Sequence, residues 1–127
     1  MSESFSDPSR LNGLEILGGD PLQDYRTIAD QTYSGQMLSQ NYGGGTANIE
    51  FEALTGFSME LFNAQMTTPY TMLMSDFDSF PSLVGTLKER GYETTAIHPY
   101  NTSMYKRKDV YETFGFDQFL DEKINEA

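Results

Sequence analysis

The stretch from Gly43 to Glu52 reads GGGTANIEFE and joins a run of glycines directly to a helical pattern. Ala47, Phe51 and Leu54 recur at helical spacing and share one face. A glycine loop that leads into a helix N-terminus lets backbone N–H groups approach an anion, and the helix dipole favours negative charge there. The stretch therefore predicts a helix that begins at or just after Thr46, with its positive end available to an anion.

The hydroxyl group of Thr46 has two possible roles at this point, helix cap or nucleophile. A cap is the commoner role, although the capping box is incomplete because Ile49 stands where Glu or Gln would complete it. The segment lacks both the Gly-Lys-Ser/Thr of a P-loop and the Gly-x-Ser-x-Gly of a nucleophile elbow. We interpret Thr46 as the nucleophile of a phosphoryl-transfer site, and the residues alone leave the cap open.

Helical and strand patterns alternate along the rest of the chain. Turn signals dominate residues 7–22, and a helical pattern covers residues 22–33. Alternation of this kind indicates an α/β fold with a mostly parallel sheet flanked by helices. We also expect a short strand over Ser34 to Leu38 and an irregular stretch from Met59 to Ser75. A helix should follow, capped by Ser79, with Pro81 in its first turn and Gly91 after its end. The last expected elements are a strand over Tyr92 to Ile97 and a helix marked by Val110 and Phe114 and ended by Gly115.

The charge of the chain is strongly acidic, with 19 carboxylates against 8 cations and a net charge of −11. This balance argues against nucleic-acid binding and against a basic membrane-surface patch. Three of the cations are consecutive, Lys106 to Lys108, and such a cluster suits an anionic ligand, although short charge runs are often only solvated. Cysteine is absent, which excludes a disulfide, a thiolate nucleophile and a cysteine-based zinc site.

Three segments occur in the order of a known family and cover nearly the whole chain. They are MSESFSD at residues 1–7, GGGTANIEFEALTG at residues 43–56, and IHPYN at residues 97–101, which is followed by YKR at 105–107 and YETFGFD at 111–117. Together they resemble the lipoteichoic acid synthase family, which are phosphoglycerol transferases of the sulfatase and alkaline phosphatase superfamily. The resemblance implies a partial sulfatase/alkaline-phosphatase-like fold.

The same resemblance assigns roles to five residues. Thr46 would be both nucleophile and metal ligand, and Glu3 would be a second ligand to Mn²⁺ or Mg²⁺, which prefer hard oxygen donors. His98 and Arg107 would hold the phosphoglycerol group. Tyr105 would form an aromatic wall where relatives commonly have tryptophan.

The implied activity is transfer of a glycerophosphate group from a lipid such as phosphatidylglycerol, through a covalent threonine intermediate, to a glycolipid or polymer acceptor. Residues 1–127 would form the N-terminal part of an extracellular catalytic domain, in a protein anchored to the membrane by helices upstream. The remaining metal ligands would lie downstream, so we expect these residues alone to hold an incomplete metal site and to be inactive.

Several alternatives stay open. A phosphoethanolamine transferase or a phosphodiesterase would share the threonine and the metal, whereas a sulfatase is disfavoured because no Cys/Ser-x-Pro-x-Arg signature occurs. A non-catalytic binding or sensory protein could keep the fold, although the presence of both Thr46 and Glu3 weighs against it. Glu50 and Glu52 receive no catalytic role, because carboxylates in the first turns of a helix usually serve its dipole.

Overall fold

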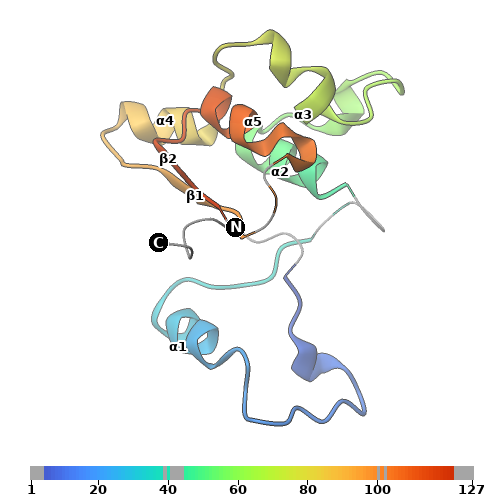
Figure 1. Ribbon diagram of the computed structural model, residues 1–127, viewed down its shortest axis with the longest axis vertical. Helices are drawn as coiled ribbons and strands as arrows, with labels where there is room; N and C mark the ends of the chain where they lie inside the picture. The colour runs from blue at the N-terminus through green and yellow to red at the C-terminus, as the bar shows by residue number, and fades with distance from the viewer. Residues whose placement is uncertain (1–4, 39, 41–44, 100, 102, 122–127) are drawn as a thin grey trace. The chain divides into compact units, whose positions relative to one another are not determined.

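The computed structural model describes residues 5–38, 40, 45–99, 101 and 103–121. The chain falls into two compact units, Met1–Gln40 and Asn41–Ala127, and each is described by itself. Figure 1 shows the helices and strands along the chain.

The described residues of the first unit form one short 3-10 helix and one α-helix. The 3-10 helix η1 covers Pro8–Arg10, and Asp7 caps it by accepting a hydrogen bond from the Ser9 amide at 2.9 Å. Helix α1 covers Gln23–Gln31, which confirms the predicted helix over residues 22–33. None of the described residues of this unit is buried, so its order rests on local hydrogen bonds and ion pairs.

The strand predicted over Ser34 to Leu38 is wrong, because the structure gives these residues no strand. A strand is stabilised by a hydrogen-bonded neighbour. In the described residues the two paired strands both belong to the second unit. The segment also holds no β-branched or aromatic residue, so neither its composition nor a neighbouring strand favours a strand here.

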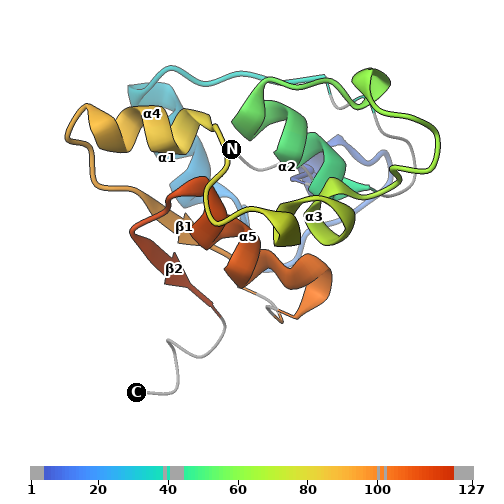
Figure 2. The same ribbon diagram turned by 90° about the horizontal axis from the view of Figure 1, so that it is seen from above.

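In the described residues of the second unit, three α-helices supply one buried core. A fourth lies beside a small sheet (Figures 1 and 2). Its two strands pair in parallel, with Ala96 opposite Phe119, which confirms the predicted parallel α/β arrangement. The elements are α2 (Thr46–Thr55), η2 (Met59–Leu61), α3 (Pro69–Met72), η3 (Met74–Asp76), α4 (Leu83–Glu89), β1 (Thr95–Ile97), η4 (Met104–Lys106), α5 (Arg107–Phe114) and β2 (Gln118–Leu120).

The core of this unit lies between α2, α3 and α5. Phe51 of α2 and Tyr70 of α3 have no exposed surface, and Phe114 of α5 is 1% exposed. Tyr70 and Phe114 meet edge to face with ring centroids 5.8 Å apart, the geometry that aromatic pairs favour. Helix α5 ends at Gly115, whose φ of 95° is left-handed, so the predicted glycine stop is confirmed. The core fixes α2 and α5 against each other.

Two predicted boundaries need correction. The stretch from Met59 to Ser75 is not irregular throughout, because Ser58 caps η2 and Pro69 starts α3. The next helix starts at Leu83, later than Ser79 and Pro81 suggested. Its cap is Ser82, whose hydroxyl accepts a hydrogen bond from the Gly85 amide at 2.9 Å and donates one to the Phe114 carbonyl at 2.7 Å. This second bond, to a distant residue, explains why Ser82 is the cap.

The strand predicted over Tyr92 to Ile97 is shorter in the structure, and β2 was not predicted at all. The difference arises at Thr94, whose amide donates to the Asp117 carboxylate at 2.9 Å instead of to a strand neighbour. Lys88 holds the other oxygen of Asp117 at 2.7 Å, so a polar cluster replaces the first part of the strand. Within the part of the chain that the structure describes, no helix is long and apolar enough to cross a membrane.

Candidate functional site

Thr46 is the first residue of helix α2, as the glycine loop predicted. The cap position belongs to Gly45, whose φ of 79° is left-handed and whose carbonyl accepts from the Asn48 amide at 2.8 Å. The first N–H groups of a helix have no partner within it, so the half-buried side chain of Thr46 lies at a positive helix end. Thr46 is therefore not the cap residue, and its hydroxyl stands where an anion is favoured.

Core packing and side-chain hydrogen bonds hold helix α2 in place after Thr46. Ala47 and Phe51 are buried in the core, and the Asn48 side-chain amide donates to the Thr67 carbonyl at 2.9 Å. Glu52 accepts a hydrogen bond from the Met59 amide at 2.7 Å. The interpretation of Glu52 as a carboxylate that serves the helix dipole is therefore incomplete, because it ties α2 to the following segment.

Arg107 and Glu50 form an ion pair that joins the first residue of α5 to the second turn of α2. Arg107 Nη2 donates to Glu50 Oε1 at 2.7 Å, Arg107 Nε donates to Glu50 Oε2 at 3.3 Å, and the Tyr111 hydroxyl donates to Glu50 Oε2 at 3.0 Å. The side chains of Arg107 and Glu50 are 4% and 13% exposed. The surface-dipole interpretation of Glu50 is thus wrong: this carboxylate is the partner of a buried arginine.

The electrostatics of this cluster follow from burial. A cation in the first turn of a helix is disfavoured by the dipole, and burial opposes the charged form of Arg107. The hydrogen bond and the charge of Glu50 outweigh burial and raise the pKa of Arg107. Burial, reinforced by Glu50, raises the pKa of Tyr111 to about 12 and that of Tyr70 further still. Arg107 therefore stays cationic, and Tyr111 and Tyr70 stay neutral, near neutral pH.

Tyr105 contacts Arg107 directly. The Arg107 guanidinium carbon lies 5.3 Å from the centroid of the Tyr105 ring, within the range of a cation–π interaction. The backbone that carries this contact is strained, because Tyr105 and Lys106 have φ values of 59° and 51°. Left-handed residues other than glycine cost on the order of 1–3 kcal/mol each and persist where the surrounding structure holds them. The strain marks the junction of η4 and α5 as a fixed feature.

His98 follows the last residue of β1, which is where the sequence predicted it. Its amide donates to the Leu120 carbonyl at 2.8 Å, so it extends the pairing of β1 with β2 by one hydrogen bond. Its side chain is half-buried. The structure thus joins Tyr105 to Arg107 by direct contact, whereas β1 positions His98 and α2 positions Thr46.

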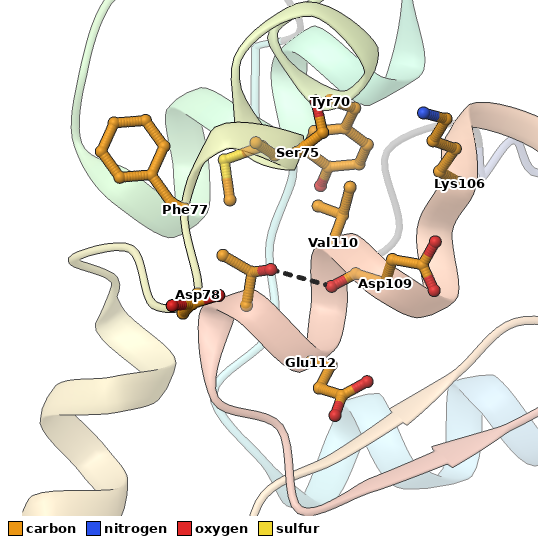
Figure 3. A pocket seen from close by; sticks show the side chains of 10 residues that line it. Tyr70, Ser75, Phe77, Asp78, Lys106, Asp109, Val110 and Glu112 are labelled. Atoms are coloured by element: carbon orange, nitrogen blue, oxygen red, sulfur yellow. Dashed lines mark hydrogen bonds between the residues drawn. The ribbon is translucent and has the colours of Figure 1, made fainter.

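A cavity of about 400 Å³ lies beside α5, on the side of η3 (Figure 3). Its charged lining is mostly acidic, because Asp78, Asp109 and Glu112 outnumber Lys106. The hydroxyl of Thr113, which also lines the cavity, donates to the Asp109 carbonyl at 3.0 Å. An acidic lining disfavours a phosphate group. None of the predicted site residues lines the cavity, so we do not identify it with the predicted site.

The structure describes one of the two residues that were predicted to bind a metal ion. Glu3 lies outside the described residues. Among the residues that are described, no three His, Asp or Glu side chains gather closely enough to hold a metal ion. The described residues therefore do not form a metal site by themselves, and Thr46 is the one predicted ligand whose position is known.

Two curated relatives match most of this chain. A protein of Rhizobium meliloti (strain 1021), whose name connects it with cyclic beta-1,2-glucan modification, is 41% identical over 123 residues, which are 97% of this chain and 18% of that protein. An uncharacterized protein of Haemophilus influenzae is 28% identical over 100 residues, 79% of this chain and 18% of that protein. The chain thus spans 18% of the length of either relative.

Two solved structures resemble the fold described above. The Streptococcus pyogenes phosphoglycerol transferase GacH, in complex with sn-glycerol-1-phosphate, matches with a TM-score of 0.58 and 31% identity over 82% of this chain and 27% of its own. The lipoteichoic acid synthase LtaP from Listeria monocytogenes matches with a TM-score of 0.52 and 28% identity over 61% of this chain and 18% of its own. These matches confirm the resemblance to phosphoglycerol transferases and the partial α/β fold. The sulfatase family model matches residues 1–127 throughout, and the chain belongs to the sulfatase family.

Proposed function

We propose that the whole protein is a phosphoglycerol transferase in which Thr46 is the nucleophile. The observation that carries the proposal is the position of Thr46, as the first residue of a firmly held helix behind a left-handed glycine cap. Its support comes from the likeness to GacH and LtaP, which are named as a phosphoglycerol transferase and a lipoteichoic acid synthase. The positive end of α2 is suited to a phosphate that approaches the hydroxyl.

The proposed reaction has two displacements at phosphorus. The Thr46 Oγ1 atom attacks the phosphorus of phosphatidylglycerol, a threonine O–P bond forms, and the bond from phosphorus to the diacylglycerol oxygen breaks. The diacylglycerol leaves after it takes up the proton that Thr46 lost. An acceptor hydroxyl then attacks the same phosphorus, and Thr46 Oγ1 leaves and regains a proton. Glycerophosphate is thus transferred, and the threonine returns to its starting state.

The head group would be held by residues on α5 and after β1. Arg107 directs two of its five guanidinium N–H donors to Glu50, and in this proposal other donors of the same group would bind phosphate oxygens. Tyr105 packs on the guanidinium and would flank the glycerol. His98, at the carboxyl end of a parallel strand, stands where α/β sheets place ligands.

A divalent cation belongs to this proposal, with Mn²⁺ preferred over Mg²⁺. Glu3 and Thr46 would supply two of its oxygen ligands, and further ligands would come from beyond these residues. When bound, the cation offsets the negative charge of the phosphate.

We propose a sugar hydroxyl as the acceptor, which fits the predicted glycolipid or polymer. The support is the Rhizobium meliloti relative, whose name refers to a cyclic glucan. Such a donor and acceptor would meet outside the cell, so we also propose that the whole protein is anchored to the membrane and acts on its extracellular face.

The test is Thr46→Ala in the whole protein, measured by release of diacylglycerol from phosphatidylglycerol and by transfer to cyclic β-1,2-glucan or to a glycolipid. We expect loss of activity by a factor on the order of 10³ or more with folding unchanged. Mass spectrometry of the wild type should find a phosphoglycerol adduct on Thr46. Thr55→Ala is the matched control, because its hydroxyl donates to the Phe51 carbonyl at the other end of α2. Full activity in Thr46→Ala would overturn the proposal.

A further inference from the structure

Thr46 and Glu50 lie four residues apart on α2 and therefore share one face of the helix. One helical turn, about 6 Å along the axis, separates their positions. Glu50 binds the guanidinium of Arg107 through two hydrogen bonds, so the carboxylate that holds this arginine lies one turn from the proposed nucleophile. The geometry links the start of α2 to the start of α5 through one carboxylate.

Three independent features fix the guanidinium in this place. Glu50 binds it at two nitrogens, and Tyr111 donates to the same carboxylate at 3.0 Å. Tyr105 covers the guanidinium face at 5.3 Å. The left-handed backbone at Tyr105 and Lys106 sets the direction in which α5 begins. Such an arrangement limits the ways in which the remaining N–H donors of Arg107 can point.

We propose that Glu50 is a positioning residue for the donor head group, an inference that rests on the proposed function. Glu50 touches no substrate; it orients Arg107 so that N–H donors other than the two bound to Glu50 meet the phosphate that Thr46 attacks. Tyr111 supports the same carboxylate. The ion pair thus does more than join two helices. A guanidinium that a carboxylate holds in one orientation binds phosphate with defined geometry.

The test compares Glu50→Gln with Glu52→Gln in the whole protein. The matched control changes a carboxylate on the same helix that binds only the Met59 amide in the described contacts. We expect Glu50→Gln to raise the KM for phosphatidylglycerol about 10- to 100-fold, as loss of a supporting partner does in other sites. We expect Glu52→Gln to leave KM unchanged. A purely structural loss would lower the folded fraction and the apparent kcat while KM stayed the same.

Tyr111→Phe is the second variant, because it keeps the aromatic ring in the core and removes only the hydroxyl bonded to Glu50. We expect a smaller rise in KM, and the lost hydrogen bond should cost about 1 kcal/mol of stability, which leaves the protein folded under assay conditions. An unchanged KM in both Glu50→Gln and Tyr111→Phe, at full folding, would overturn the inference.

Binding of sn-glycerol-1-phosphate, measured by calorimetry, separates this inference from the proposed function. Binding to the wild type that is weakened by Glu50→Gln and unaffected by Glu52→Gln supports the inference. Equal binding to wild type and Glu50→Gln overturns the inference and leaves the proposed function standing. No binding and no transfer by the wild type would overturn the proposed function itself.

Discussion

Residues 1–40 and residues 41–127 each place an arginine among oxygen acceptors, and the two arginines lie in opposite environments. Arg26 pairs with Asp7 at 2.9 Å and with Asp20 at 2.6 Å, and its side chain is 40% exposed. Arg107 pairs with Glu50 at 2.7 Å, and its side chain is 4% exposed. The contacts are alike in length, so the difference lies in the surroundings.

That difference decides what each arginine contributes. Water and salt screen the exposed cluster, and the median exposed ion pair adds little stability. A buried ion pair adds little net stability when it forms. Removal of one partner, however, leaves the other charge buried without a partner. The Arg26 cluster therefore organises a loop locally, whereas the Arg107 cluster adds a buried polar contact between α2 and α5, which also meet in the hydrophobic core.

The largest effect on stability is expected for Arg107→Ala. It leaves Glu50 buried without its cation, and such losses cost about 3–5 kcal/mol. Denaturant unfolding should show a lower midpoint, and under the proposed function the remaining folded protein should bind the head group weakly with slow turnover. Lys108→Ala is the control, because Lys108 is the exposed neighbour on the same helix. A midpoint equal to that of the wild type would show that Arg107 is not buried as described.

A smaller effect is expected for Tyr111→Phe, which removes one hydrogen bond to Glu50 and keeps the ring. The cost should be about 1 kcal/mol, the usual net value of such a bond. A double-mutant cycle with Glu50→Gln measures the coupling, since the second change should cost less once the first is made. Strictly additive costs would mean that Tyr111 and Glu50 act separately.

The parts of the fold that the sequence predicted are the parts with local signals. Gly45 and Thr46 mark the start of α2, and Gly115 marks the end of α5, because a helix end depends on a few neighbouring residues. The strand predicted at residues 34–38 failed for the opposite reason. Composition alone cannot provide a strand with a hydrogen-bonded neighbour.

The part of the candidate site that the sequence missed is the role of Glu50. Glu50 and Arg107 are 57 residues apart, and nothing near Glu50 in the sequence points to α5. The same holds for Ser82, which caps α4 but also bonds the Phe114 carbonyl, 32 residues away. The family resemblance pointed to Arg107 and Tyr105, but the carboxylate that holds the arginine emerges only when the chain folds.

A partly exposed cluster at Asp117 should respond to pH without any substitution. Its bonds to Lys88 and Thr94 lower the pKa of Asp117 from 3.8 to about 2. Because the folded pKa is the lower one, the stabilising contribution is present above pH 3.8 and is lost as the pH falls toward 2. Asp117→Asn should remove this part of the acid dependence in urea unfolding measured across that range. An unchanged pH profile in Asp117→Asn would contradict the pairing with Lys88.

The smallest effect on global stability is expected for Arg26→Ala. None of the described residues in 1–40 is buried, and helix α1 keeps its Tyr25 and Ile28 side chains 46% and 61% exposed. Loss of Arg26 removes contacts that lower the pKa values of Asp7 and Asp20. Asp20 is 38% exposed to water, and Asp7 keeps its hydrogen bonds from the Ser9 amide and hydroxyl, so neither charge is left buried without a partner. The unfolding midpoint should therefore stay at the wild-type value, while amide hydrogen exchange becomes faster in α1 and in the segment from Asp7 to Asp20. Exchange in α2 and α5 should not change. A cooperative loss of protection in those two helices would show that Arg26 contributes to the core as Arg107 does, and the contrast between the two arginines would then fail.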